Sequence, residues 1–76
     1  MDQETKREKF VRLAEKRTNR ILEQIGLLGN LSNTNAYEYS QKDIDTIFQA
    51  IDLSVKDAKR KFADASNSKP TKFTLE

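Results

Sequence analysis

The stretch that decides the fold is Tyr39–Phe62, which reads YSQKDIDTIFQAIDLSVKDAKRKF. Its apolar residues recur at alternating steps of four and three, which is the spacing that places side chains along one side of a helix. The members of this seam are Ile44, Phe48, Ile51, Val55, Ala58 and Phe62. The spacing predicts a helix from Gln41 to about Ala63.

The start of this helix is marked by Ser40 and Asp43. A serine at the N-cap accepts a hydrogen bond from the backbone three residues on, and an acidic side chain at the third helical position returns one. Tyr39 and Ile44 occupy the two positions of a hydrophobic staple. These four residues predict that the helix begins directly after Ser40.

Another heptad pattern lies N-terminal to this stretch, and it predicts a helix from about Thr5 to Leu28. Thr5 and Glu8 fit a capping box at its start. Gly29 is placed to end the helix in the left-handed conformation, whereas Gly26 is an internal glycine with a cost of about 1 kcal/mol relative to alanine. The seam consists of Val11, Ala14, Thr18, Ile21, Ile25 and Leu28, widened by Phe10, Leu13 and Leu22.

The segment between the two helices is rich in asparagine and serine, whose side chains bond to nearby backbone and favour turns. It is longer than most connections between helices. We therefore expect an all-α fold: an antiparallel two-helix hairpin (residues 5–28 and 41–63) in one domain, residues 1–64. Residues 65–76 are predicted to be a disordered tail, and residues 75–76 fit a tag remnant.

Composition argues against catalysis. The 76-residue chain contains no cysteine and no histidine, so it lacks thiolate nucleophiles, imidazole bases and the usual zinc ligands. No glycine-rich phosphate loop or metal-ligand spacing is present. We expect no enzymatic activity, no metal, no cofactor and no small-molecule substrate. The polar, acidic start is unlike a signal peptide and no apolar run would span a bilayer, so a cytoplasmic protein without membrane contact is predicted.

A two-helix hairpin leaves one side of each apolar seam uncovered. The simplest way to cover that side is a homodimer that forms a four-helix bundle. The alternative is a monomer whose connection and tail cover the seam. The residues predicted to mediate self-association are Phe10, Leu13, Ile21, Leu22, Ile25, Phe48, Ile51 and Val55.

The net charge of +2 conceals a strong segregation. Residues 6–20 and 56–61 together hold eleven basic and three acidic residues, a net charge of +8, whereas residues 21–55 have a net charge of −4. The segregation fits a solvated surface with ion pairs such as Asp57–Lys61, a surface for nucleic acid or another polyanion, or pairing between copies of the chain. The candidate polyanion-binding residues are Lys9, Arg12, Lys16, Arg20, Lys56, Lys59 and Arg60.

Three stretches, Arg12–Arg17, Leu27–Asn33 and Tyr37–Tyr39, read RLAEKR, LLGNLSN and YEY. Over about residues 9–62 the chain resembles a group of short, uncharacterised bacterial proteins with an LLGNLSN-like turn followed by Tyr-x-Tyr between two helices. The resemblance implies a bacterial, intracellular, compact helical protein and adds no site residues. No motif assigns a biochemical function. Our leading hypothesis is a non-enzymatic helical protein–protein interaction module, and the alternative is a small nucleic-acid-binding or regulatory protein.

Overall fold

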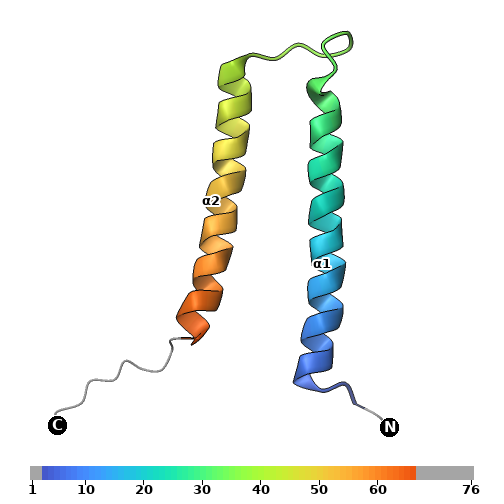
Figure 1. Ribbon diagram of the computed structural model, residues 1–76, viewed down its shortest axis with the longest axis vertical. Helices are drawn as coiled ribbons and strands as arrows, with labels where there is room; N and C mark the ends of the chain where they lie inside the picture. The colour runs from blue at the N-terminus through green and yellow to red at the C-terminus, as the bar shows by residue number, and fades with distance from the viewer. Residues whose placement is uncertain (1–2, 67–76) are drawn as a thin grey trace, which may run out of the picture. The chain divides into compact units, whose positions relative to one another are not determined.

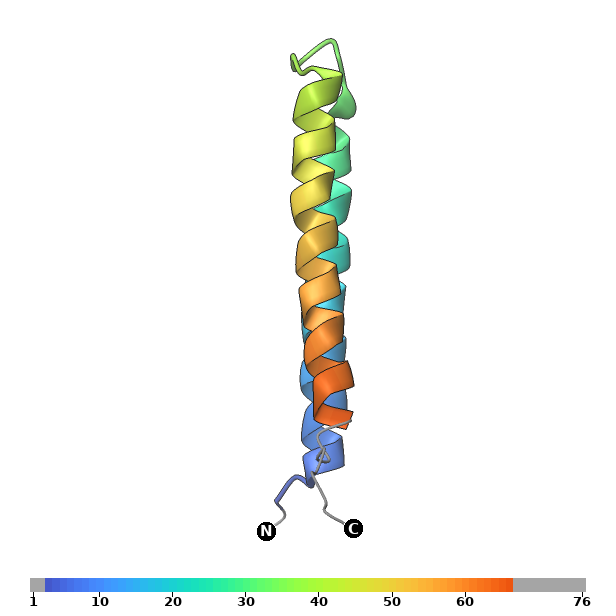
Figure 2. The ribbon, with the colours of Figure 1, turned by 90° about the vertical axis from the view of Figure 1, so that its left-hand side faces the viewer.

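The computed structural model describes residues 3–66, and every regular element in that range is helical (Figure 1). Helix α1 spans Lys6–Gly29, the short 3-10 helix η1 spans Asn30–Ser32, and α2 spans Gln41–Ser66. The chain divides between Glu38 and Tyr39 into two units, each built around one long helix. The prediction of two helices is confirmed, because each is continuous over its length. Figure 2 shows the uninterrupted course of α2 from the side.

Helix α1 begins at the predicted capping box. The backbone N–H of Glu8 donates to Thr5 Oγ1 at 3.0 Å, and the backbone N–H of Thr5 donates to Glu8 Oε1 at 2.9 Å. Thr5 itself is extended, with φ −74° and ψ 167°. The two bonds satisfy amides that would otherwise lack a partner in the first turn.

The predicted end of α1 is wrong in its geometry. Gly29 is not left-handed: its φ of −61° and ψ of −27° keep it in the right-handed helical region. The backbone N–H of Asn30 bonds back into the last turn, to the carbonyl of Gly26 among others, and the chain continues into η1. Tightened bonding of this kind satisfies the last carbonyls without a left-handed residue. The ability of glycine to adopt a positive φ is therefore not used at this position.

Asn33 organises the connection that follows. Its side-chain Oδ1 accepts a hydrogen bond from the backbone N–H of Asn35 at 3.0 Å. Its carbonyl oxygen accepts from the N–H groups of Ala36 and Tyr37, at 3.1 and 3.0 Å. This is the turn chemistry expected of asparagine, within a connection, residues 33–40, that is long rather than a tight turn.

Helix α2 begins directly after Ser40, as predicted. The N–H of Asp43 donates to Ser40 Oγ at 3.1 Å, and the N–H of Ser40 donates to Asp43 Oδ2 at 2.9 Å. The first-turn side chain of Gln41 also donates to Asp45 Oδ1 at 2.8 Å. At its other end α2 extends past the predicted Ala63 to Ser66. The rest of the predicted tail, residues 67–76, lies outside the described residues.

Burial is low throughout residues 3–66, because no side chain in that range is buried. The half-buried residues are Val11, Leu13, Ala14, Leu28, Ile44 and Ile51. All six belong to the predicted seams or widen them. Neither described helix combines the length and the apolar content that crossing a bilayer requires. Each unit, taken by itself over its described residues, therefore has an apolar seam but no enclosed core.

Candidate functional site

The first candidate surface is the apolar face of α1. It consists of Phe10, Leu13, Ile21, Leu22 and Ile25, which are all residues predicted to self-associate. Leu13 is half-buried, whereas Leu22 is 61% exposed and Ile21 is 56% exposed. Because large aliphatic side chains lose about 1.5–3 kcal/mol each by staying in water rather than being fully buried, this face is suited to contact with another surface.

The apolar face of α2 consists of Phe48, Ile51 and Val55, which complete the predicted self-association set. Ile51 is half-buried, and Phe48 and Val55 are exposed. Farther along the same seam Phe62 is 65% exposed. The structure thus places all eight predicted residues on helices and leaves six of them exposed.

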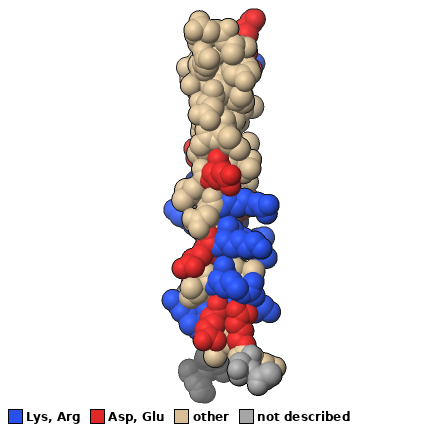
Figure 3. Space-filling model, turned by 90° about the vertical axis from the view of Figure 1, so that its right-hand side faces the viewer, with Lys and Arg blue, Asp and Glu red and all other residues tan. Residues whose placement is uncertain are grey.

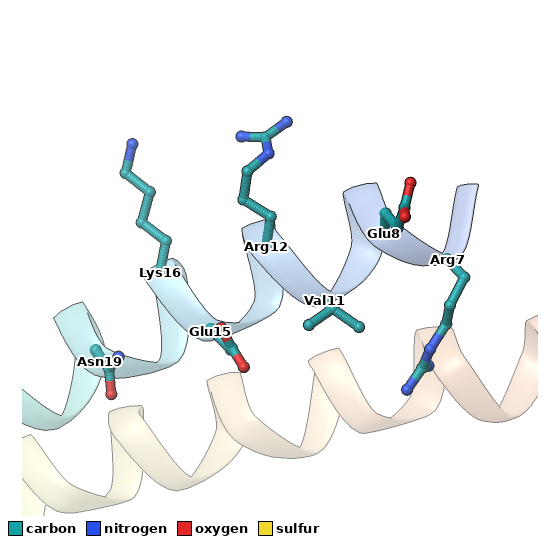
Figure 4. Close-up of a pocket in the computed structure, with 7 residues that line it drawn as sticks. All are labelled: Arg7, Glu8, Val11, Arg12, Glu15, Lys16 and Asn19. Carbon is teal, nitrogen blue, oxygen red and sulfur yellow. The ribbon is translucent and has the colours of Figure 1, made fainter. Parts of the chain in front are cut away.

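The second candidate surface is the basic stripe of α1, made of Lys9, Arg12, Lys16 and Arg20. All four side chains are exposed. Their spacing of three and four residues puts them along one side of the helix. Figure 4 shows Arg12 and Lys16 extending from one side of α1 while Val11 extends from another. The stripe is therefore separate from the seam.

The basic stripe borders an open hollow on the surface of α1 (Figure 4). Its lining residues are Arg7, Glu8, Val11, Arg12, Glu15, Lys16 and Asn19. All seven come from a single helix, so the hollow has no opposing wall to exclude water or to orient a reacting group. A shallow hollow of this kind offers contact surface rather than a catalytic pocket.

Arg12 differs from the other members of the stripe because it is paired with Glu4. Its Nε donates to Glu4 Oε2 at 2.8 Å and its guanidinium Nη2 donates to Glu4 Oε1 at 3.0 Å. The hydrogen bond from Arg12 holds the pKa of Glu4 below its ordinary value of 4.5, and the bond to Glu4 raises the pKa of Arg12. Part of the positive charge of the stripe is thus neutralised by Glu4.

The predicted basic residues on α2 are Lys56, Lys59 and Arg60, and all are exposed. Asp57 approaches Arg60, with 3.7 Å between Oδ1 and Nη2. Helical spacing offered Lys61, one residue farther on, as an example of a partner for Asp57, and the partner that the structure shows is Arg60. Both partners of the observed pair are well exposed, and an ion pair of this type contributes about 0–1 kcal/mol.

Charge changes abruptly along α1. Residues 6–20 carry seven basic and two acidic side chains, and residues 21–32 carry a single charge, Glu23. Figure 3 shows this on one face of the molecule, where Lys and Arg gather over the first half of α1 and the second half is almost uncharged. One helix thus presents two chemically different surfaces in succession.

Two interactions were missed by the sequence reasoning. The Arg7 guanidinium lies over the Phe10 ring, 5.9 Å from its centroid, and the three-residue spacing of a cation and an aromatic ring could have indicated it. The Glu4–Arg12 pair carries no such signal, because Glu4 precedes the helix and helical spacing does not apply to it.

In the described range no three acidic side chains come together in a way that could hold a metal ion. Comparison with protein-family models, with curated proteins and with solved structures gives no match for this chain. The suggested likeness to short bacterial proteins therefore stays a prediction.

Proposed function

We propose that this chain is a small, non-enzymatic helical module that acts through protein–protein contact, made by the apolar faces of α1 and α2. The observation that carries the proposal is the exposure of large apolar side chains on both helices, with no buried residue anywhere in residues 3–66. The lack of cysteine and the resemblance of its turn to bacterial sequences support a bacterial cytoplasmic setting.

The proposed arrangement begins with an antiparallel hairpin. Packed helices have axes about 8–10 Å apart, and the connection, residues 33–40, can span up to roughly 26 Å when extended. Two paired helices bury only one side of each seam. A second copy of the chain covers the open side, and the product is a four-helix bundle of two hairpins.

The test is the mass of the protein in solution across a range of concentrations, measured by sedimentation equilibrium together with helix content by circular dichroism. We expect about twice the chain mass of 8.8 kDa, with helix content that falls as dilution separates the copies. A fully helical 8.8 kDa monomer at every concentration would rule the proposal out.

A second candidate function, supported by the charge of residues 6–20, is binding of nucleic acid or another polyanion. The net charge of that segment is +5, and exposed lysines and arginines on one side of a helix can follow a row of phosphates. In this candidate the basic stripe acts with Lys56, Lys59 and Arg60. The Glu4–Arg12 pair weakens the case, because a phosphate would have to compete with Glu4.

This candidate is tested by NMR titration of labelled protein with a short mixed-sequence DNA duplex, at low and at physiological salt. Binding predicts shifts confined to residues 6–20 and 56–61 that fade as salt rises. Replacing Lys16 and Arg20 with glutamine should reduce the slope of log K against log salt by about 0.9 for each phosphate that the variant no longer neutralises. The control is Lys42→Gln, which removes a base from residues 21–55, where the net charge is −4. The absence of shifts at both salt concentrations would exclude this function.

A further inference from the structure

We infer that the second copy docks head to tail, so that the connection of each copy lies beside the basic end of the other. The basic end denotes residues 6–20 and 56–61, and the acidic part denotes residues 21–55. This inference rests on the proposed self-association and adds to it the orientation of the partner. It follows from the way charge is distributed along the two helices.

Each helix is electrically asymmetric along its own length. In α1, residues 6–20 have a net charge of +5, and residues 21–29 contain only Glu23. In α2 the order of signs is reversed. Residues 41–55 hold three aspartates and one lysine, for a net charge of −2, and residues 56–61 have a net charge of +3. The N-terminal half of α1 is thus complementary to the N-terminal half of α2.

An antiparallel hairpin cannot use this complementarity within one chain. Antiparallel pairing brings the start of α1 beside the end of α2, and both are basic. In the proposed hairpin, one end would therefore have a net charge of +8 and the acidic part a net charge of −4. Parallel pairing of α1 with α2 matches opposite charges, and it becomes available when the α2 helix belongs to a second copy.

The two orientations of a second hairpin have opposite electrostatic consequences. With the connections at the same end, two basic ends of +8 lie side by side and repel each other. With the connections at opposite ends, each basic end lies beside an acidic part of −4, twice per dimer. Complementary charge of this kind selects the orientation of a complex more than it adds affinity.

The length of the helices makes this selection effective. The 24 residues of α1 extend about 36 Å, whereas charges in physiological salt are screened over about 8 Å. The basic end and the acidic part are therefore separate electrostatic regions, and each responds only to what lies beside it. The apolar seams extend along both helices, so apolar contact is available in either orientation of the second hairpin. The orientation is therefore determined by the charges.

Orientation can be measured directly with a spin label, because the sequence contains no cysteine. Asn35→Cys places one spin label in the connection. Spin-labelled protein of natural isotope content is mixed with protein that carries no spin label and is enriched in nitrogen-15. Head-to-tail docking predicts broadening of amide signals within residues 6–20 of the enriched copy. Broadening confined to residues 30–41 would place the connections together and overturn the inference.

A control label separates failure of orientation from failure of self-association. Ser54→Cys lies near the middle of α2, so its label should broaden signals of the enriched copy in either orientation of a dimer. If the label at Ser54→Cys broadens signals of the enriched copy while the label at Asn35→Cys broadens only residues 30–41, the copies associate but do not dock head to tail. That outcome overturns the inference and leaves self-association standing. Absence of broadening from both labels, with a monomeric mass, overturns self-association and the inference with it.

A matched pair of charge reversals on α2 supplies an independent test. Under head-to-tail docking Asp45→Lys sets a positive charge against the partner's basic end, so the dissociation constant of self-association should rise severalfold at low salt and less at physiological salt. Asp57→Lys makes the same change within the basic end, which faces the partner's acidic part, and should not weaken association. The opposite ranking of the two variants would overturn the inference.

Discussion

The carboxylate of Glu4 accepts two hydrogen bonds from the guanidinium of Arg12, eight residues farther along the chain. The acid lies just before α1 and the base lies two turns inside it. The pair therefore holds the residue before the N-cap against the side of the helix. Within residues 3–66, Arg12 thus differs from the other bases of the stripe, because its charge is paired with Glu4.

The first prediction concerns the ionisation of Glu4. Its pKa lies below the ordinary 4.5 because Arg12 donates to the charged form. The stabilisation from the pair is thus present above the unfolded-state pKa and is lost as the pH falls through the lower folded-state pKa. Arg12→Gln should raise the pKa of Glu4 toward its ordinary value, as followed by the carboxyl carbon signal in an NMR pH titration. Lys16→Gln is the control and should leave that pKa unchanged.

The second prediction compares two apolar residues of α2 that are two positions apart. Ile51 belongs to the seam and is half-buried, whereas Leu53 lies away from the seam and is 54% exposed. Ile51→Asp should abolish association or folding, because a carboxylate cannot be buried in an apolar contact without a partner. In the proposed dimer, Leu53→Asp should leave the mass in solution and the helix content unchanged. Equal behaviour of the two variants in sedimentation and circular dichroism would contradict a seam-mediated contact.

The third prediction concerns the start of α2. Ser40→Ala removes the acceptor of the Asp43 N–H and should lower the free energy of unfolding by about 0.5–2 kcal/mol. Ser54→Ala makes the same chemical change inside α2, where alanine is a better helix former, and should be neutral or stabilising by a few tenths of a kcal/mol. Urea denaturation followed by circular dichroism distinguishes the two. A Ser40→Ala protein as stable as the parent would mean that the cap contributes nothing.

The fourth prediction follows from the right-handed backbone at Gly29. Apart from its chain neighbours and the adjacent backbone of its own helix, a Cβ at this position would meet no atom within 4 Å, and the same is true of Gly26. Gly29→Ala should therefore stabilise the protein by about 0.4–1 kcal/mol, and Gly26→Ala should do so by about 1 kcal/mol. A left-handed Gly29 would give the opposite sign for Gly29→Ala, so thermal unfolding of this variant tests the end of α1.

Sequence reasoning found the parts of this fold that local chemistry determines. Ser40 and Asp43 locate the start of α2, and Thr5 with Glu8 locates the start of α1, because each capping bond joins residues three apart. It failed at Gly29, because glycine permits the left-handed conformation without requiring it. Carbonyls there can be satisfied either by a left-handed cap or by continued tight turns, and composition does not choose between them.

The candidate surfaces were predictable to a different extent. Helical spacing is sufficient to group Lys9, Lys16 and Arg20 on one side of α1, and the structure leaves them exposed. The state of Arg12 was not predictable, because its partner precedes the helix and the conformation of that segment has no periodic signal. Spacing alone also could not show that Asp57 approaches Arg60 rather than Lys61, since both distances along the helix allow an ion pair.

The two capping boxes have a consequence for the rate at which the protein assembles. Starting a helix is its slow step, because several dihedral angles must be fixed before the first hydrogen bond forms. Thr5 and Ser40 supply side-chain bonds at that point, so both helices can form within roughly a microsecond and without waiting for each other. If a second copy covers the apolar faces, the encounter of two chains is then the rate-limiting step of assembly. Refolding after dilution from denaturant should be second order, and the half-time of assembly should shorten as protein concentration rises.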